Sequence, residues 1–293
     1  MVNRVDFGWV VPSEGAIEGG VLPLLSELEA MVIPSVARHF DSLWIYDHLY
    51  AFRQPTAPYL EGWTALTWLA GRFPGMDVGT VVLSAGYRNP ALLAKMAGTL
   101  HALSPGRFIL GLGAGWRDEE FRAYGYPFPD ASERIQQLEE AVRIIRLMWT
   151  ENNPSFHGEY FQIEGAYCYP QPSPPGPIMI GGDGEQLMLP LVGRLADWWN
   201  VGQVGGLEDL RRKRDIVHRS AEEAGRDPGD IRLTHIIQRF HWPATDSESR
   251  QWVDYLKSIQ GLGFDYFIID ARTDSYEIIE RFNEQVIEVV RAT

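Results

Sequence analysis

The sequence predicts one (β/α)8 TIM-barrel domain over residues 1–293, with an insertion after the fourth βα unit. Three observations predict this fold class. Short apolar runs of strand length alternate with segments of helical periodicity. The strands read as continuous apolar runs, which is typical of parallel strands covered on both faces. The length of 293 residues suits one large α/β barrel.

The predicted elements follow one another in strand–helix order. The expected strands cover residues 5–11, 42–46, 77–84, 107–112, 178–182, 197–201, 232–238 and 264–270. The expected helices cover residues 22–40, 61–73, 89–103, 130–149, 185–196, 207–224, 247–262 and 275–291. The alternation pauses at about 152–177, which is rich in Pro, Gly and aromatic residues. We interpret this stretch as an insertion between barrel units, with a small hairpin over 156–163 and prolines that form a lid over the substrate.

Composition narrows the class of protein. The net charge of −13 argues against a nucleic-acid partner, because no basic stripe is present to release counterions. No apolar run is long enough to span a bilayer, and the first residues lack a signal-peptide layout. Cys168 is the only cysteine, so no disulfide forms within the chain. These features predict a cytoplasmic protein with no nucleic-acid partner and no membrane partner.

The stretch 103–128, LSPGRFILGLGAGWRDEEFRAYGYPF, contains the most distinctive strand. Alternation puts Phe108, Leu110 and Leu112 on a bulky face, whereas the opposite face becomes bare at Gly111 and Gly113. A flat ligand is able to lie against that bare backbone. The alternative is that the glycines only relieve crowding inside a barrel. A G-x-G-x-x-G dinucleotide turn does not fit, because the third glycine would have to stand at Trp116.

Active sites of such barrels lie at the C-terminal ends of the strands. There the sequence places the pair Asp47-His48, in which histidine can donate or accept a proton near neutral pH. The alternatives are a structural histidine and, for Asp47, a role in fixing the loop. The other cofactor-binding candidates at strand ends are Ser84, Arg88, Gly113, Ala114 and Gln203, and the family resemblance given below adds Val81 and Val82.

Gly181-Gly182-Asp183-Gly184 precedes the helix expected from Glu185. Free N–H groups at a helix N-terminus bind phosphate, and glycines allow it to approach closely. The alternative is an ordinary βα turn. Asp183 is unfavourable beside a phosphate and is expected to point away or to cap the helix, and Arg88 is a candidate source of positive charge.

Other barrel chemistries fit less well. The three lysines fall in predicted helices, which excludes a Schiff-base aldolase, and the histidines show no metal-ligand spacing. A glycosidase needs two carboxylates about 5 to 9.5 Å apart. Asp47, Glu119 and Asp270 are able to supply such a pair, so this alternative remains open.

The stretch LSPGRFILGLGAGW, the Glu-rich turn after it and YGYPF together resemble the bacterial luciferase-like superfamily, most closely its F420-dependent oxidoreductase branch. The resemblance implies the deazaflavin F420 as cofactor and hydride exchange with a small organic substrate. In relatives an Asp-His pair after strand two lies where cofactor and substrate meet, which makes His48 the expected proton donor or acceptor. Relatives also carry a non-proline cis peptide in strand three, here expected at Val81-Val82, and GG-x-G beside the cofactor's tail phosphate.

The chain departs from the family's sugar-phosphate dehydrogenases at two positions. Trp116 stands where they carry an acidic proton donor, and Phe52 replaces their catalytic Trp, so a sugar phosphate is not expected as substrate. Glu119 and Glu120 are interpreted as first-turn acids favoured by the helix dipole. The alternatives within the superfamily are an FMN-dependent monooxygenase and a non-catalytic flavin binder. Family members often form dimers, and the sequence leaves a homodimer open.

Overall fold

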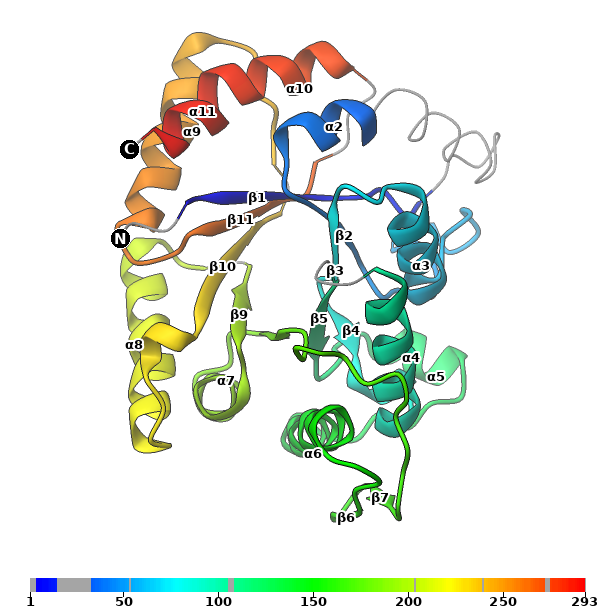
Figure 1. The fold of residues 1–293 in the computed structure, drawn as a ribbon. Coiled ribbons are helices and arrows are strands. Elements are labelled where there is room, and N and C mark those ends of the chain that lie inside the picture. The colour runs from blue at the N-terminus through cyan, green and yellow to red at the C-terminus, as the bar shows by residue number, and fades with distance from the viewer. Residues whose placement is uncertain are drawn as a thin grey trace.

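The computed structural model describes residues 4–14, 33–52, 54–104, 108–202, 204–238, 240–271 and 275–292. Within them, parallel strands close into a barrel in the order β3-β2-β1-β11-β10-β9-β8-β5, and β5 pairs back to β3. Figure 1 shows the helices arranged around this barrel. The predicted (β/α)8 fold class is therefore confirmed.

The strands match the apolar runs of the sequence. The barrel strands are β1 (Asp6–Val10), β2 (Ser42–Ile45), β3 (Asp77–Thr80) with its continuation β4 (Leu83–Ser84), β5 (Phe108–Gly113), β8 (Ile178–Gly181), β9 (Trp198–Val201), β10 (Arg232–Ile237) and β11 (Tyr266–Ile269). The first and last strands of the barrel pair with each other. Gly8 of β1 lies opposite Ile268 of β11 on one side and Ser42 of β2 on the other.

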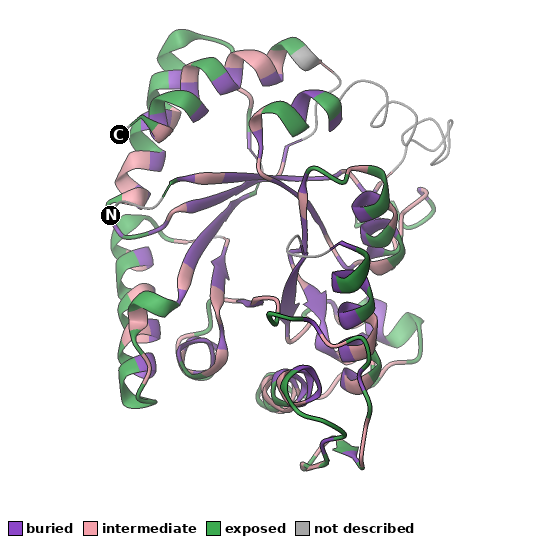
Figure 2. Cartoon of the chain, viewed as in Figure 1, coloured by how far each residue is buried: buried purple, intermediate pink, exposed green. Residues whose placement is uncertain are grey.

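The helices cover the outside of the barrel, and their buried faces point towards the strands (Figure 2). Their bounds are α2 (Ile33–His39), α3 (Gly62–Arg72), α4 (Pro90–Leu103), α5 (Asp118–Ala123), α6 (Ala131–Thr150), α7 (Met188–Leu195), α8 (Leu207–Glu223), α9 (Asp246–Gln260), α10 (Tyr276–Phe282) and α11 (Glu288–Arg291). Short 3-10 turns lie at Ala85–Tyr87 and Pro228–Asp230, and a π-helical turn, Asn283–Ile287, joins α10 to α11. No helix among the described residues is long and apolar enough to cross a membrane.

Two helices begin at capping residues that the sequence predicts. The Asn89 side chain accepts from the backbone N–H groups of Ala91 and Leu92, and Pro90 occupies the first turn of α4. Asp130 likewise accepts from the N–H of Glu133 at the start of α6. Most of the helix expected over 22–40 lies outside the described residues, which include only α2 of it.

Two predicted elements were wrong in their bounds. The third strand is not continuous over 77–84, because it breaks between β3 and β4 at the Val81–Val82 peptide, which is cis. The expectation of a cis peptide at this position is thus confirmed. The helix after the fifth barrel strand begins at Met188 and not at Glu185, since a turn intervenes after Gly184.

The insertion packs against α6, since the hydroxyl of Tyr160 donates to Gln136 at 2.6 Å and Glu140 accepts from the N–H of Phe161 at 2.9 Å. It contains the antiparallel hairpin of β6 (Phe156–His157) and β7 (Gln162–Ile163), as predicted. The segment connects the end of α6 to the start of β8, and its Gly176 lies next to the carbonyl of Phe108, at the N-terminal end of β5. No residue of 152–177 lines either of the cavities found at the C-terminal ends of the strands, so the expectation that its prolines form a lid over the substrate is not supported.

One tryptophan fills much of the barrel interior. A Cβ at Gly8 would lie 2.2 Å from Nε1 of Trp44, and a Cβ at Gly79 would lie 2.4 Å from its Cζ3. Trp44 is fully buried, and its Nε1 donates to Oγ of Ser42 at 2.7 Å. The interior is thus closed by packed side chains, and space for a ligand remains only towards the mouth.

Candidate active site

A cavity of about 740 Å³ lies at the C-terminal ends of the strands. The loops after β1, β2, β5 and β8 line it, together with the β3–β4 break. A second cavity of about 460 Å³ adjoins it and shares Val82, Gly182 and Gln238. Together they offer a wide chamber that continues into a side arm, which suits a ring system with a tail.

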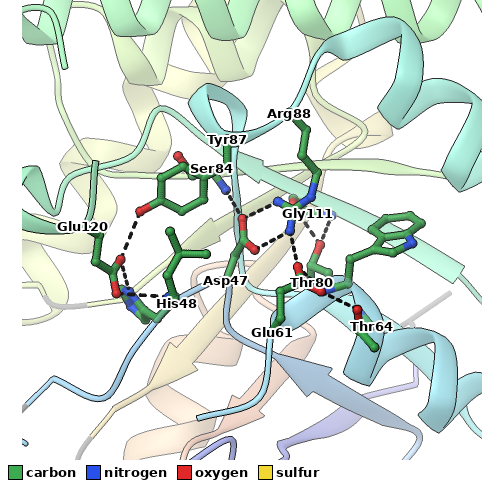
Figure 3. A network of polar contacts seen from close by, with 12 residues as sticks. Asp47, His48, Glu61, Thr64, Thr80, Ser84, Tyr87, Arg88, Gly111 and Glu120 are labelled. Atoms are coloured by element: carbon green, nitrogen blue, oxygen red, sulfur yellow. Dashed lines mark hydrogen bonds and ion pairs between the residues drawn. The ribbon is translucent and has the colours of Figure 1, made fainter. Parts of the chain in front are cut away.

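Asp47 is held by the loop that follows β4. Its carboxylate accepts from both terminal nitrogens of Arg88, at 2.7 and 2.8 Å, and from the backbone N–H of Ser84 at 2.9 Å (Figure 3). Arg88 also donates to Glu61, whose side chain caps α3 through the N–H groups of Trp63 and Thr64. This network joins three loops beneath the cavity floor.

Arg88 lies away from the two cavities, because it lines neither of them. Its side chain is 12% exposed and is occupied by the carboxylates of Asp47 and Glu61. The expectation that Arg88 offers a positive charge to an anionic cofactor was therefore wrong. For Asp47 the geometry favours the loop-fixing alternative over direct cofactor contact.

His48 lies at the cavity beside a buried carboxylate. Its Nδ1 is 3.0 Å from Oε2 of Glu120 (Figure 3). Because an ionised carboxylate only accepts, the neutral imidazole carries its proton on Nδ1. The lone pair is then on Nε2, on the side of the ring away from Glu120. His48 is thereby oriented as a proton acceptor, or as a donor when it is charged.

Glu120 is the residue that sequence reasoning missed. It is fully buried and also accepts from Arg117 at 2.8 Å, from Tyr87 at 3.0 Å and from the N–H of Leu49 at 3.2 Å. Burial alone raises the pKa of Glu120, but the hydrogen bonds and charge of His48, with those of Leu49 and Tyr87, bring it below its usual 4.5. Glu120 is therefore ionised at neutral pH. Glu120 does lie in the first turn of α5, as expected, but its side chain is buried against His48, whereas the side chain of Glu119 is 80% exposed.

Aromatic rings surround the other sides of His48. Ring centroids of Tyr46, Tyr59 and Trp116 lie 6.2, 6.5 and 5.8 Å from its imidazole, and Phe52 lies 5.9 Å from Trp116. Trp116 and Phe52, the two positions at which the sequence departs from the sugar-phosphate dehydrogenases, therefore meet at the mouth.

Val82 lines both cavities. A Cβ at Gly113 or at Gly181 would lie 2.7 or 2.8 Å from its methyl groups, so these glycines make room for the valine. Gly111 makes room for the carbonyl of Thr80, 1.8 Å from where its Cβ would be. The sequence had led us to expect bare strand backbone at these glycines. In the structure the side chain of Val82 covers Gly113 and Gly181. Gly113 and Ala114 do line the second cavity.

The glycine loop Gly181–Gly184 also lines the second cavity, although it lies before α7 and not in its first turn. The charge of Asp183 is balanced, because Nζ of Lys213 donates to it at 3.0 Å. Lys213 is itself buried and also pairs with Asp209 at 3.4 Å. Gln203 lies outside the described residues.

Two buried hydroxyls of the cavity wall, Ser13 Oγ and Ser84 Oγ, have no hydrogen-bond partner among the described residues. Buried polar atoms of this kind favour a ligand with polar groups that satisfy them. On the far side of the cavity, the hydroxyl of Tyr46 donates to Asp270 at 2.7 Å. Burial and the charge of Asp270 raise the pKa of Tyr46 well above its usual value, so it stays protonated.

The open glycosidase alternative loses its carboxylate pair. Asp47 is bound by Arg88, Asp270 by Tyr46, and Glu119 does not line the cavity.

What the fold and site define is a TIM-barrel enzyme with one oriented histidine at a chamber of cofactor size. The chain belongs to the luciferase-like monooxygenase family, whose model matches residues 7–285.

Similar sequences carry a more specific description. An F420-dependent glucose-6-phosphate dehydrogenase of Kineococcus radiotolerans is 33% identical over 215 residues, which are 72% of this chain and 63% of the relative. The enzyme of the same description from Intrasporangium calvum is 39% identical over 165 residues, 54% of this chain and 46% of the relative. The matched regions thus span less than two thirds of the relatives' own length.

Solved structures share the fold over nearly the whole chain. An F420-dependent secondary alcohol dehydrogenase in complex with an F420-acetone adduct has a TM-score of 0.81 at 19% identity, covering 98% of this chain and 99% of that one. An EDTA monooxygenase from Chelativorans has a TM-score of 0.80 at 15% identity, covering 99% and 94%. At these identities the likeness shows the fold alone.

Proposed function

We propose that the protein is an F420-dependent oxidoreductase that exchanges hydride between the deazaflavin and a small organic substrate. The observation that carries this proposal is the pair His48–Glu120 at the large cavity, with Nδ1 fixed 3.0 Å from a buried carboxylate. Supporting it, the similar sequences are described as F420-dependent dehydrogenases.

The large cavity offers polar groups to the ring of a bound cofactor. The buried hydroxyls of Ser13 and Ser84 lack protein partners among the described residues, and a ring with carbonyl and N–H groups satisfies them. The residues proposed to hold F420 are Val81, Val82, Ser84, Gly113, Ala114, Gly181, Gly182, Asp183 and Gly184. Asp47 and Arg88 support this wall from behind.

F420, when bound, accepts or supplies hydride, and the protein handles the accompanying proton. Oxidation of an alcohol to a carbonyl compound releases one hydride from carbon and one proton from oxygen. Nε2 of His48 takes that proton, and the Glu120 carboxylate stabilises the imidazolium that results. In the reverse direction the imidazolium returns the proton to the carbonyl oxygen.

Arg117 and Tyr87 keep the pair in place. Both donate to the Glu120 carboxylate, so the His48 ring is oriented by groups that are themselves fixed. Tyr87 remains a donor at working pH, because burial and the charge of Glu120 raise its pKa. A reactive group positioned in this way loses little entropy on reaching the transition state.

The test is turnover under two conditions. The protein is assayed anaerobically with F420 against a panel of alcohols and carbonyl compounds, and aerobically with reduced FMN against the same panel. The proposal expects conversion with F420 and without oxygen, and a strong loss of rate in His48→Ala. Conversion that requires oxygen and reduced FMN would instead identify a monooxygenase.

A further inference from the structure

Two large aromatic side chains stand exposed at the cavity mouth. Trp116 is 62% exposed and Phe52 is 63% exposed, and their ring centroids are 5.9 Å apart. Trp116 also lies edge to face with His48, at 5.8 Å and 85°. Paired aromatic surface next to a candidate catalytic group contributes little to folding and is typical of a ligand-binding site.

The aromatic pair is supported from below by Arg117. This guanidinium is 7% exposed and stacks on the rings of Tyr50 and Phe52, at 4.4 and 4.9 Å. Its Nη1 donates to Glu120 at 2.8 Å and to the carbonyl of Tyr50 at 3.1 Å. The loop after β2 and the loop after β5 are thereby fixed to each other, so Phe52 and Trp116 form a preorganised surface.

The charged groups of the large cavity do not favour an anion. In the described lining stand the carboxylates of Glu14, Asp47, Glu120, Asp183 and Asp270 and a single guanidinium, that of Arg117. That guanidinium is already bound to Glu120. Asp47 and Asp183 are likewise paired, with Arg88 and Lys213. The described lining therefore leaves no guanidinium or ammonium group for a phosphate or carboxylate placed beside His48, whereas an uncharged body faces the aromatic pair.

We infer, on the basis of the F420-dependent function proposed above, that the substrate is an uncharged alcohol with an apolar ring or chain, or the matching carbonyl compound. Its apolar body lies on Trp116 and Phe52, and its oxygen lies at Nε2 of His48. In the oxidation, the O–H proton passes to Nε2 and the C–H hydride passes to F420. The C–O bond becomes a carbonyl, and the two electrons leave with the hydride.

The test is calorimetric binding to the F420-loaded protein. Oxidised F420 cannot reduce a ketone, so cyclohexanone and acetophenone are titrated without turnover. Glucose 6-phosphate is the charged probe, and because it is able to reduce oxidised F420, the F420 absorbance is followed in its titration to exclude turnover. We expect both ketones to bind at least about tenfold more tightly than glucose 6-phosphate. Trp116→Ala and Phe52→Ala should each weaken ketone binding about tenfold and leave the melting temperature unchanged, because both side chains are exposed.

The control is an exposed aromatic pair of similar spacing outside the site. Tyr167 is 67% exposed and lies 6.4 Å from Tyr169 in the insertion, so Tyr167→Ala should leave ketone binding unchanged. Tighter binding of glucose 6-phosphate, no ketone binding, or unchanged ketone affinity in Trp116→Ala would overturn the inference. The fluorescence of F420 reports cofactor binding in the same samples. Loss of cofactor binding counts against the proposed function, whereas cofactor binding without a preference for ketones counts against the apolar subsite alone.

Discussion

Nδ1 of His48 and Oε2 of Glu120 are 3.0 Å apart, although His48 follows β2 and Glu120 lies in α5, after β5. The carboxylate is fully buried, whereas the His48 side chain is 23% exposed at the cavity. A buried anion behind a partly exposed imidazole fixes the ring, selects its tautomer and stabilises its charged form. The chemistry proposed for this protein depends on that relationship.

Replacing the Glu120 carboxylate tests whether its contact with His48 supports catalysis. Glu120→Gln keeps the size and an acceptor for Nδ1 but removes the charge that stabilises the imidazolium. We expect turnover to fall by about ten- to a hundredfold, with the F420 dissociation constant changed little. Steady-state kinetics and cofactor fluorescence measure the two quantities. The matched control is Glu119→Gln, since the neighbouring carboxylate is 80% exposed and should be replaceable without loss.

Removing the imidazole should have a larger effect. In His48→Ala no group remains to take or return the proton, and general acid–base catalysis typically contributes about 10²- to 10⁴-fold. We therefore expect turnover to fall within that range while F420 binding persists. Unchanged turnover would show that His48 has only a structural role.

The sequence located half of this pair. Asp47-His48 could be predicted because a strand of clear length ends just before it, and barrel strands end at the active site. Glu120 could not, because three consecutive acids at a helix start usually serve the helix dipole. One hint was present in the sequence: Glu120 directly precedes the apolar residue Phe121, which is buried in the structure. Choosing among the three acids required the direction in which α5 leaves β5.

Arg88 provides a test of the network beneath the cavity. Its substitution leaves the Asp47 carboxylate, 1% exposed, without its bidentate partner. We expect Arg88→Gln to lower the free energy of unfolding by about 3 kcal/mol, measured by urea denaturation. Adding Asp47→Asn should recover part of this loss, because the stranded charge is then removed. By comparison, Arg143→Gln breaks a surface pair with Glu139 and should cost less than about 1 kcal/mol.

The lowered pKa of His235 predicts how the free energy of unfolding depends on pH. Burial lowers the pKa of His235 to about 4, against the opposing hydrogen bond with the carbonyl of Val201, whereas the unfolded chain titrates near 6.5. The unfolded state therefore binds more protons between these values, so the stabilisation is complete above pH 6.5 and is lost as pH falls towards 4. The loss amounts to roughly 3 kcal/mol.

Denaturation at pH 7.5 and pH 4.5 measures that change, and His235→Gln should show a smaller fall than the wild type. His157→Gln replaces an exposed histidine and should keep the wild-type dependence. An equal fall in all three proteins would assign the acid sensitivity to other groups.

The fold could be predicted further than the site. Apolar runs and capping residues such as Asn89 gave the barrel and most element bounds, since these depend on local sequence. The site depends on contacts between loops that are distant in sequence. Arg88 was expected to face an anion, but it donates to Asp47 and Glu61 and has a structural role. A pattern of residues carries no information on which side chains will pair across such loops.

Equilibrium binding tests most directly whether the protein uses F420 as its cofactor. Oxidised and reduced F420 and FMN are titrated separately into the purified protein, and cofactor fluorescence gives each dissociation constant. We predict that F420 binds at least about tenfold more tightly than FMN, a difference of about 1.4 kcal/mol. Tighter binding of reduced FMN, or binding of neither cofactor, would contradict the account.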